Sequence, residues 1–134
     1  RIMKTGARLS RFSYLGQLSY DEMRRLMFAS DVFLNTSLHE GMSGAVLEAM
    51  AESLPVVATL IPGNRALVQE GENGYLVPLD APQQFIDAAC SLAGDKKLRA
   101  AMGASGKKRA AQYTVAKELY GYERIYRKVL GAEY

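Results

Sequence analysis

Two glutamates, Glu40 and Glu48, are the residues of this sequence best suited to chemistry. The segment between them, Gly41–Leu47, reads as a glycine-bearing loop followed by the start of a mostly apolar helix. A helix start binds anions such as phosphate, because its free amides and the positive end of its dipole face the ligand. A carboxylate beside it can accept two hydrogen bonds from a vicinal diol, as acidic residues do on ribose. Together these features outline a site for a sugar nucleotide.

The helix start has the residues that such a site requires. Ser43 is the expected N-cap, and Gly41 and Gly44 let a ligand approach the backbone closely. Glu48 lies about 6 Å along the helix axis from Gly44, at a rise of ~1.5 Å per residue. Two interpretations remain open from the spacing. Either Gly44, Glu48 and Glu52 form the solvent-facing edge of a buried helix, or Glu48 faces a ligand.

The loop and its helix are expected at the edge of a parallel sheet. Short apolar runs predict strands over 12–15, 31–35, 55–59 and 75–77, with 31–35 buried on both faces. Helical spacing predicts helices over 20–28, 44–52, 62–68, 81–93, and from 96 and 115 onward. The expected N-caps are Ser19, Ser43, Asp80, Asp95 and Thr114. Strands alternating with helices indicate an α/β fold: a Rossmann-like parallel sheet with helices on both faces, followed by C-terminal helices.

Composition narrows the classes of function. The 134 residues predict one domain, and the net charge of +3 suits an anionic small molecule but is too small to argue for nucleic acid. No apolar run reaches the roughly eighteen residues of a membrane helix. With one cysteine and one histidine, neither an internal disulfide nor a zinc site is expected; Cys90 is expected in the core, and the location cytoplasmic. The first residues, Arg1-Ile2-Met3, suggest a fragment of a larger protein.

Five segments carry a resemblance to a known family. They are Phe12–Gly16, Ala29–Leu34, Glu40–Ala51, Pro55–Thr59 and Asn73–Val77. Together they resemble the C-terminal domain of retaining glycosyltransferases with the two-Rossmann-domain GT-B fold, in the glycogen-synthase-like and mannosyltransferase-like group 1 family. The resemblance covers about residues 10–130. It implies that residues 1–134 form a single nucleotide-sugar-binding domain, one half of a GT-B fold, without the N-terminal acceptor domain.

The resemblance also implies roles for individual residues. Glu40 would be the catalytic residue, facing the hydroxyls of the transferred sugar and stabilising charge near the reacting centre. Glu48 would bind the ribose hydroxyls. The remaining substrate-binding residues would be Gly41, Met42, Ser43 and Gly44 through their amides, Leu47 beside the ribose, and Leu18 as the platform for the base. The donor would be a nucleoside diphosphate sugar, with no metal and no other cofactor.

The sequence departs from the family pattern at several positions. Ser53 stands where the family usually has the glycine of Gly-x-Pro, so the helix before it must end without glycine. Pro62–Arg65 replaces the usual run in the next loop, and Ala66 replaces an acid that often follows. Met42-Ser43 replaces the familiar Phe-Gly and alters the lining of the sugar pocket. The basic pair that grips the diphosphate in the family would lie upstream of Arg1.

The expected function is therefore the donor half of a retaining hexosyltransferase-type enzyme that moves a sugar from a nucleoside diphosphate to an acceptor. The expected partners are the donor, the missing N-terminal domain and an unknown acceptor, without nucleic acid. Membrane association, at the inner face, would come only through the full-length enzyme. Two alternatives remain: a sugar-nucleotide epimerase of the same architecture, and a non-catalytic binding or assembly module. Neither the base, the sugar, the acceptor nor the oligomeric state is fixed by the sequence.

Overall fold

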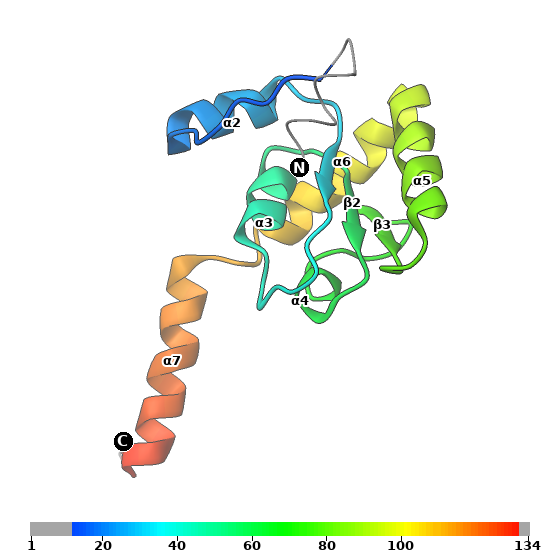
Figure 1. The fold of residues 1–134 in the computed structure, drawn as a ribbon. Helices are drawn as coiled ribbons and strands as arrows, with labels where there is room; N and C mark the ends of the chain where they lie inside the picture. Colours follow the sequence, from blue (N-terminus) through cyan, green and yellow to red (C-terminus); the bar gives the residue numbers. More distant parts are fainter. Residues whose placement is uncertain (1–11, 132–134) are drawn as a thin grey trace.

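The computed structural model describes residues 12–131. Helices and short strands alternate from α2 to α5, and two further helices follow (Figure 1). In chain order they are α2 (Tyr20–Phe28), β1 (Phe33–Asn35), α3 (Gly44–Ala51), β2 (Val56–Thr59), α4 (Pro62–Arg65), β3 (Gly74–Val77), α5 (Pro82–Gly94), α6 (Lys96–Ala110) and α7 (Val115–Leu130).

The three strands form one parallel sheet in the order β1-β2-β3. In the register, Phe33 pairs with Val56, and Val56 pairs with Gly74. Parallel pairing with helical crossovers confirms the predicted Rossmann-like α/β fold. All carboxyl ends of the strands therefore meet at one edge, and the loop after β1 lies there.

The strand predicted over residues 12–15 does not form. This segment is coil and pairs with none of the described strands, and Phe12, Tyr14 and Leu15 are exposed. An apolar run becomes a strand only where a neighbouring strand supplies its hydrogen bonds. The prediction was wrong because it rested on the apolar run alone, without a neighbouring strand to pair with it.

β1 is an edge strand, and its burial differs from the prediction. Phe33 and Asn35 face α3, whereas Leu34 points to the other side and is 51% exposed. The main strand contacts of α5, which covers that other side, are with β2 and β3. The prediction of burial on both faces is therefore wrong for β1. The strand that is buried on both faces is β2, whose four residues are all buried.

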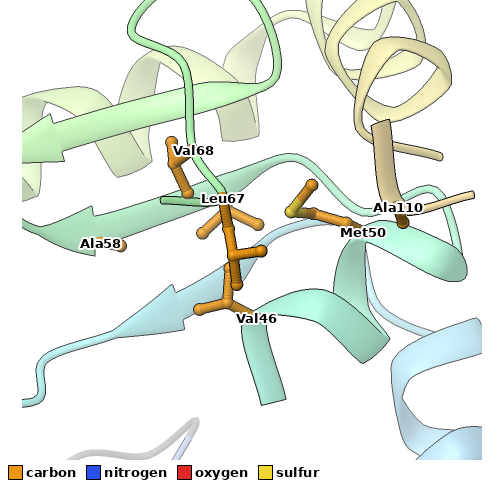
Figure 2. Close-up of a cluster of buried hydrophobic side chains, with 7 residues drawn as sticks. Val46, Met50, Ala58, Leu67, Val68 and Ala110 are labelled. Carbon is orange, nitrogen blue, oxygen red and sulfur yellow. The ribbon is translucent and has the colours of Figure 1, made fainter. Parts of the chain in front are cut away.

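The core lies on both faces of β2. On one face a cluster of aliphatic side chains joins the sheet to α3 and to the segment after α4 (Figure 2); it contains Val46, Met50, Val56, Ala58, Leu67, Val68 and Ala110. On the other face Val57 and Val77 pack against Leu92 of α5 and Met102 of α6. Successive residues of β2 thus anchor opposite layers, as the period of two in a strand requires.

α6 contacts the segments that precede β2 and β3. Gly103 lies so close to the carbonyl of Ser53 that a β-carbon there would overlap the oxygen. Arg109, from the last turn of α6, donates hydrogen bonds to the carbonyls of Leu67 at 2.7 Å and Ala66 at 2.9 Å. These hydrogen bonds tie the connection between α4 and β3 to α6.

α2 packs on the end of α3 that is distant from the helix start. Met27 contacts Ala49 and Leu54, and the Arg24 guanidinium forms an ion pair with Glu52 at 2.9 Å. The predicted cap of α2 is confirmed, because the Ser19 hydroxyl accepts a hydrogen bond from the Glu22 amide.

The carboxylate of Glu22 completes this cap. It accepts hydrogen bonds from the hydroxyl and the amide of Ser19, and these lower the pKa of Glu22 below its usual value. The negative charge at the helix start is therefore favoured both by these bonds and by the helix dipole.

The other predicted caps had mixed outcomes. Asp95 and Thr114 cap α6 and α7 with their side chains, as predicted. Asp80 does not cap α5, which begins at Pro82 after Ala81; proline fixes the backbone for the first turn and lacks the amide that a cap would satisfy.

Cys90 is exposed on α5, so its predicted burial was wrong.

α7 extends away from the body of the domain (Figure 1), and none of its residues is buried. Along its length it exposes large apolar side chains: Val115, Leu119, Tyr120, Tyr122, Ile125, Tyr126, Val129 and Leu130. Among the described residues, 12–131, no helix combines the length and the apolar character needed to cross a membrane.

The end of α3 shows the cost of the missing glycine. Ser53 follows the helix with φ of +67°, in the left-handed region. Glycine occupies this region without the steric cost that a β-carbon adds. The turn predicted to form without glycine therefore forms on a strained serine.

We predict that Ser53→Gly raises the free energy of unfolding by about 1 kcal/mol, because relief of left-handed strain exceeds the added entropy of the unfolded chain. Urea denaturation followed by circular dichroism measures the change. The matched control is Ser105→Gly within α6, where the same substitution should lower the free energy by about 0.5–1 kcal/mol. Destabilisation by both variants would contradict the assignment of strain to Ser53.

Candidate functional site

The candidate site lies where β1 and β2 end. The loop 36–43 leaves β1, and α3 begins directly after it, while α4 begins three residues after the last residue of β2. Figure 1 shows loop 36–43 and α4 side by side at this end of the sheet. In open parallel sheets this edge is where ligands bind.

A buried polar network joins the two loops. The Asn64 amide nitrogen Nδ2 donates hydrogen bonds to Asn35 Oδ1 at 3.2 Å, to the Thr59 carbonyl at 2.9 Å and to Thr59 Oγ1 at 3.3 Å. The Thr59 hydroxyl donates to the carbonyl of Ser37, and the Ser37 amide donates to Asn35 Oδ1 at 3.2 Å. Asn35, Thr59 and Asn64 are all buried. The ends of both strands and the first residues of the loop are thus held as one unit.

One atom of this network lacks a partner. Within residues 12–131, Asn64 Oδ1 is buried and accepts no hydrogen bond. An unsatisfied buried acceptor costs about 1–3 kcal/mol. The donor side of the same amide, with its three acceptors, must offset this cost, which is why its orientation is well defined.

Glu40 is held directly. The hydroxyl of Ser37 donates a hydrogen bond to Glu40 Oε1 at 2.8 Å. The backbone of Glu40 and Gly41 lies against α4, and a β-carbon on Gly63 would come within 2.5 Å of the Glu40 carbonyl oxygen. Only glycine permits this approach. Loop 36–43 therefore rests on the turn that contains Asn64.

Ser43 is at the N-cap position of α3, as predicted, but its side chain makes no capping hydrogen bond. The side chain is almost fully buried, and its hydroxyl accepts a long hydrogen bond of 3.5 Å from Asn35. Gly41 and Gly44 are exposed on either side of it. The amides at the start of α3 therefore face an accessible surface, and no acidic residue occupies its first turn.

Glu48 lies one turn into α3 and is half-buried. Glu52, one turn further, is taken up by its ion pair with Arg24 of α2. Glu48 forms no ion pair with any residue in the described part of the chain. The polar stripe of α3 is thus divided into a paired acid at its far end and an available acid near the helix start.

Met42 and Leu47 face a different space. They line a cavity of about 420 Å³ together with residues of the connection to α7 and its first turn: Gln112, Tyr113, Thr114, Val115, Lys117 and Glu118. Leu47 also packs against the core cluster drawn in Figure 2. The structure therefore separates these two predicted binding residues from the face that carries Glu48.

Leu18 is not brought to this site. It lies in the coil before α2, and Figure 1 shows that coil beside α2, away from loop 36–43. The base-binding role of Leu18 stays a prediction that rests on the resemblance.

A second cavity, of about 430 Å³, lies between α2 and α3 and is lined by Asp21, Arg24, Arg25, Phe28 and Glu52. Neither cavity is lined by Glu40 or Glu48. Glu40 and Glu48 are both half-buried and flank the exposed Gly41 and Gly44, and we refer to this surface of residues 40–48 as the ledge. Within residues 12–131, no group of three or more histidine, cysteine, aspartate and glutamate side chains could hold a metal ion.

The sequence did not predict the hydrogen-bond network that holds loop 36–43. Ser37 had a local signal, because Ser37 and Glu40 have the Ser-x-x-Glu spacing that also forms the cap at Ser19 and Glu22. Asn64 had none, since its partner Asn35 is 29 residues away in the sequence.

Comparison with known proteins identifies the family. The family model described as "Glycosyl transferases group 1" matches residues 2–95. The chain therefore belongs to the group 1 glycosyltransferases, which confirms the resemblance at the level of the family and favours neither of the two alternatives.

Curated relatives agree. A D-inositol 3-phosphate glycosyltransferase of Corynebacterium urealyticum is 38% identical over 94 residues, which is 70% of this chain and 22% of the relative. A UDP-Gal:alpha-D-GlcNAc-diphosphoundecaprenol alpha-1,3-galactosyltransferase of Escherichia coli is 38% identical over 58% of this chain and 20% of its own length. An uncharacterized glycosyltransferase of Methanocaldococcus jannaschii is 29% identical over 90% of this chain and 34% of its own. The chain thus spans about a fifth to a third of these relatives.

Solved structures confirm the fold. Sucrose-phosphate synthase from Thermosynechococcus elongatus superposes with a TM-score of 0.87 at 22% identity, over 98% of this chain and 33% of the other. The C-terminal domain of a glycosyl transferase group 1 family protein from Francisella tularensis superposes with a TM-score of 0.72 at 28% identity, over 83% of this chain and 58% of the other. The expected Rossmann-like half of a GT-B fold is therefore the fold of this chain.

We predict that Thr59→Val lowers the free energy of unfolding by about 1–3 kcal/mol, because it removes a buried hydroxyl while keeping the shape of the side chain. The Ser37 carbonyl then loses its donor. Chemical denaturation measures the change. Thr36→Val, an exposed position in the same loop, is the control and should stay within about 0.5 kcal/mol of the parent. Equal effects at both positions would contradict the importance of the network.

Proposed function

We propose that residues 1–134 form the domain that binds the nucleotide sugar in a retaining glycosyltransferase. The observation that carries the proposal is the ledge itself: a buried network presents one acid, Glu40, beside an accessible helix start, and Glu48, one turn further, forms no ion pair within residues 12–131. Membership of the group 1 family supports transfer as the chemistry. The complete enzyme would move a hexose from a nucleoside diphosphate to an acceptor.

In this proposal the start of α3 binds the diphosphate. Its first amides have no partner within the helix, and the dipole adds positive potential there. Gly41 and Gly44 keep the approach open, and Met42 and Ser43 contribute their amides. Leaving-group charge would thus be stabilised by fixed dipoles rather than by mobile water.

Glu48 would bind the ribose. It lies about 6 Å further along the axis than Gly44, a separation that suits the step from a phosphate to the sugar attached to it. Its two oxygens can each accept a hydrogen bond from one of two neighbouring hydroxyls. Glu52 is already paired with Arg24, whereas Glu48 has no ion pair in the part of the chain that the structure describes and is therefore the acid we assign to the ligand.

Glu40 would face the transferred sugar on the other side of the diphosphate. Its carboxylate would accept hydrogen bonds from sugar hydroxyls and stabilise positive charge that develops at the reacting carbon. Retention of configuration belongs to this proposal through the resemblance of the Glu40–Ala51 segment to retaining enzymes.

The names of similar proteins support a nucleotide sugar as the ligand. The relative from Escherichia coli is named for UDP-Gal, and a pneumococcal O-GlcNAc transferase of similar fold, with a TM-score of 0.77 at 23% identity, was solved in complex with UDP and GlcNAc. We propose a second, acceptor-binding domain as the partner that closes the open ledge and excludes water. Transfer without a metal, and a cytoplasmic location, are parts of the same proposal.

The central test is nucleotide binding by the full-length protein. UDP, GDP and ADP are titrated by calorimetry, and we expect Glu48→Ala to raise the Kd of the preferred nucleotide about 10–100-fold, since hydrogen bonds to a charged group are lost. Glu52→Ala is the matched control one turn along the same helix and should stay within about twofold.

Two outcomes would count against the proposal. If none of the three nucleotides binds, or if Glu48→Ala leaves binding unchanged, the chain is a non-catalytic module rather than a donor domain. If the protein instead converts a nucleotide sugar without any acceptor, the activity is that of an epimerase.

A further inference from the structure

The two carboxylate oxygens of Glu40 are not equivalent. Oε1 accepts the hydrogen bond from the Ser37 hydroxyl at 2.8 Å, whereas Oε2 accepts none from the residues that the structure describes. This hydrogen bond favours one orientation of the carboxylate over the others. Oε2 is therefore the atom that remains for a ligand.

Ser37 is itself immobilised through its backbone. Its amide donates to Asn35 Oδ1, and its carbonyl accepts from the Thr59 hydroxyl. Both of those side chains are buried, and both accept from the Asn64 amide nitrogen. A continuous set of hydrogen bonds thus runs from α4 through the ends of β1 and β2 to Glu40.

The Ser37 side chain adds to this set without belonging to the core. Ser37 is half-buried, and its hydroxyl contacts Glu40 rather than a packed interior group. In the cap of α2, the same Ser-x-x-Glu spacing makes reciprocal bonds with the backbone and starts a helix. No helix starts at Ser37, and only the bond between the two side chains forms there. This bond therefore orients Glu40 and contributes little to the fold.

We infer that Ser37 is a positioning residue for sugar recognition: its hydroxyl holds the Glu40 carboxylate toward the transferred sugar, and the Asn64 network holds Ser37. The inference rests on the proposed function, because it takes Glu40 as the residue on the sugar side. It goes further by separating recognition of the sugar from recognition of the nucleotide. Loss of the Ser37 hydroxyl should weaken recognition of the sugar and leave recognition of the nucleotide unchanged.

The experiment compares two classes of ligand on the full-length protein. Calorimetry measures Kd for UDP, GDP and ADP, and for UDP-glucose, UDP-galactose, UDP-N-acetylglucosamine, GDP-mannose and ADP-glucose. For the preferred nucleotide and its sugar, Ser37→Ala should raise the Kd of the nucleotide sugar about 3–10-fold, because the Glu40 side chain must then be ordered on binding. Binding of the bare nucleotide should stay within about twofold.

Two controls separate positioning from general damage. Ser37→Thr keeps the hydroxyl and should restore the affinity for the sugar, and Ser91→Ala, an exposed serine on α5, should change neither ligand. In a Glu40→Ala background, Ser37→Ala should have no additional effect, since the group that it positions is gone. Thermal unfolding should show the same midpoint for Ser37→Ala and the parent.

The outcomes distinguish the inference from the proposed function. If Ser37→Ala weakens both ligands equally, weakens neither, or acts equally in the Glu40→Ala background, the inference is overturned while the donor site stands. If the parent binds neither class of ligand, the proposed function fails and the inference with it.

Discussion

The structure depends on one buried amide. Asn64 donates to groups at the ends of both β1 and β2, and adjacent parallel strands are about 4.8 Å apart, a gap that one short polar side chain can bridge. Its partners Asn35 and Thr59 in turn form hydrogen bonds with the backbone of Ser37 in loop 36–43. Gly63, next to Asn64, lets the backbone of Glu40 lie against α4. The loop is therefore held at Ser37 by the ends of both strands and at Glu40 and Gly41 by α4.

The layers behind the sheet make this arrangement possible. β2 is buried on both faces and carries small aliphatic residues, so the polar groups needed for ligand binding are confined to the strand ends. α6 fixes the segment after α4 through Arg109, and α2 occupies the far end of α3 through Arg24 and Glu52. Each support lies away from loop 36–43. Under the proposed function, these supports hold the start of α3 and the ends of the strands, and they leave the ledge free for a second domain to cover.

The departures from the family pattern acquire physical meaning here. Ser53 takes a left-handed conformation that glycine would take without strain, and its carbonyl still fits against Gly103. Pro62–Arg65 replaces the usual run after β2, yet it supplies both the glycine that admits loop 36–43 and the asparagine that anchors it. The altered sequence therefore provides a tight contact between the two loops.

The sequence by itself determined the class of fold, most helix ends and the place of the glutamate loop. These depend on local causes: apolar periodicity, Ser19, Asp95 and Thr114 as caps, and a glycine-bearing turn before α3. Tertiary structure alone decided which acid of α3 is paired, which face Leu47 takes, why residues 12–15 form no strand, and what orients Glu40. Each of these depends on a partner far along the chain, such as Arg24 for Glu52 or Asn64 for Asn35, and spacing within a segment carries no information about such a partner.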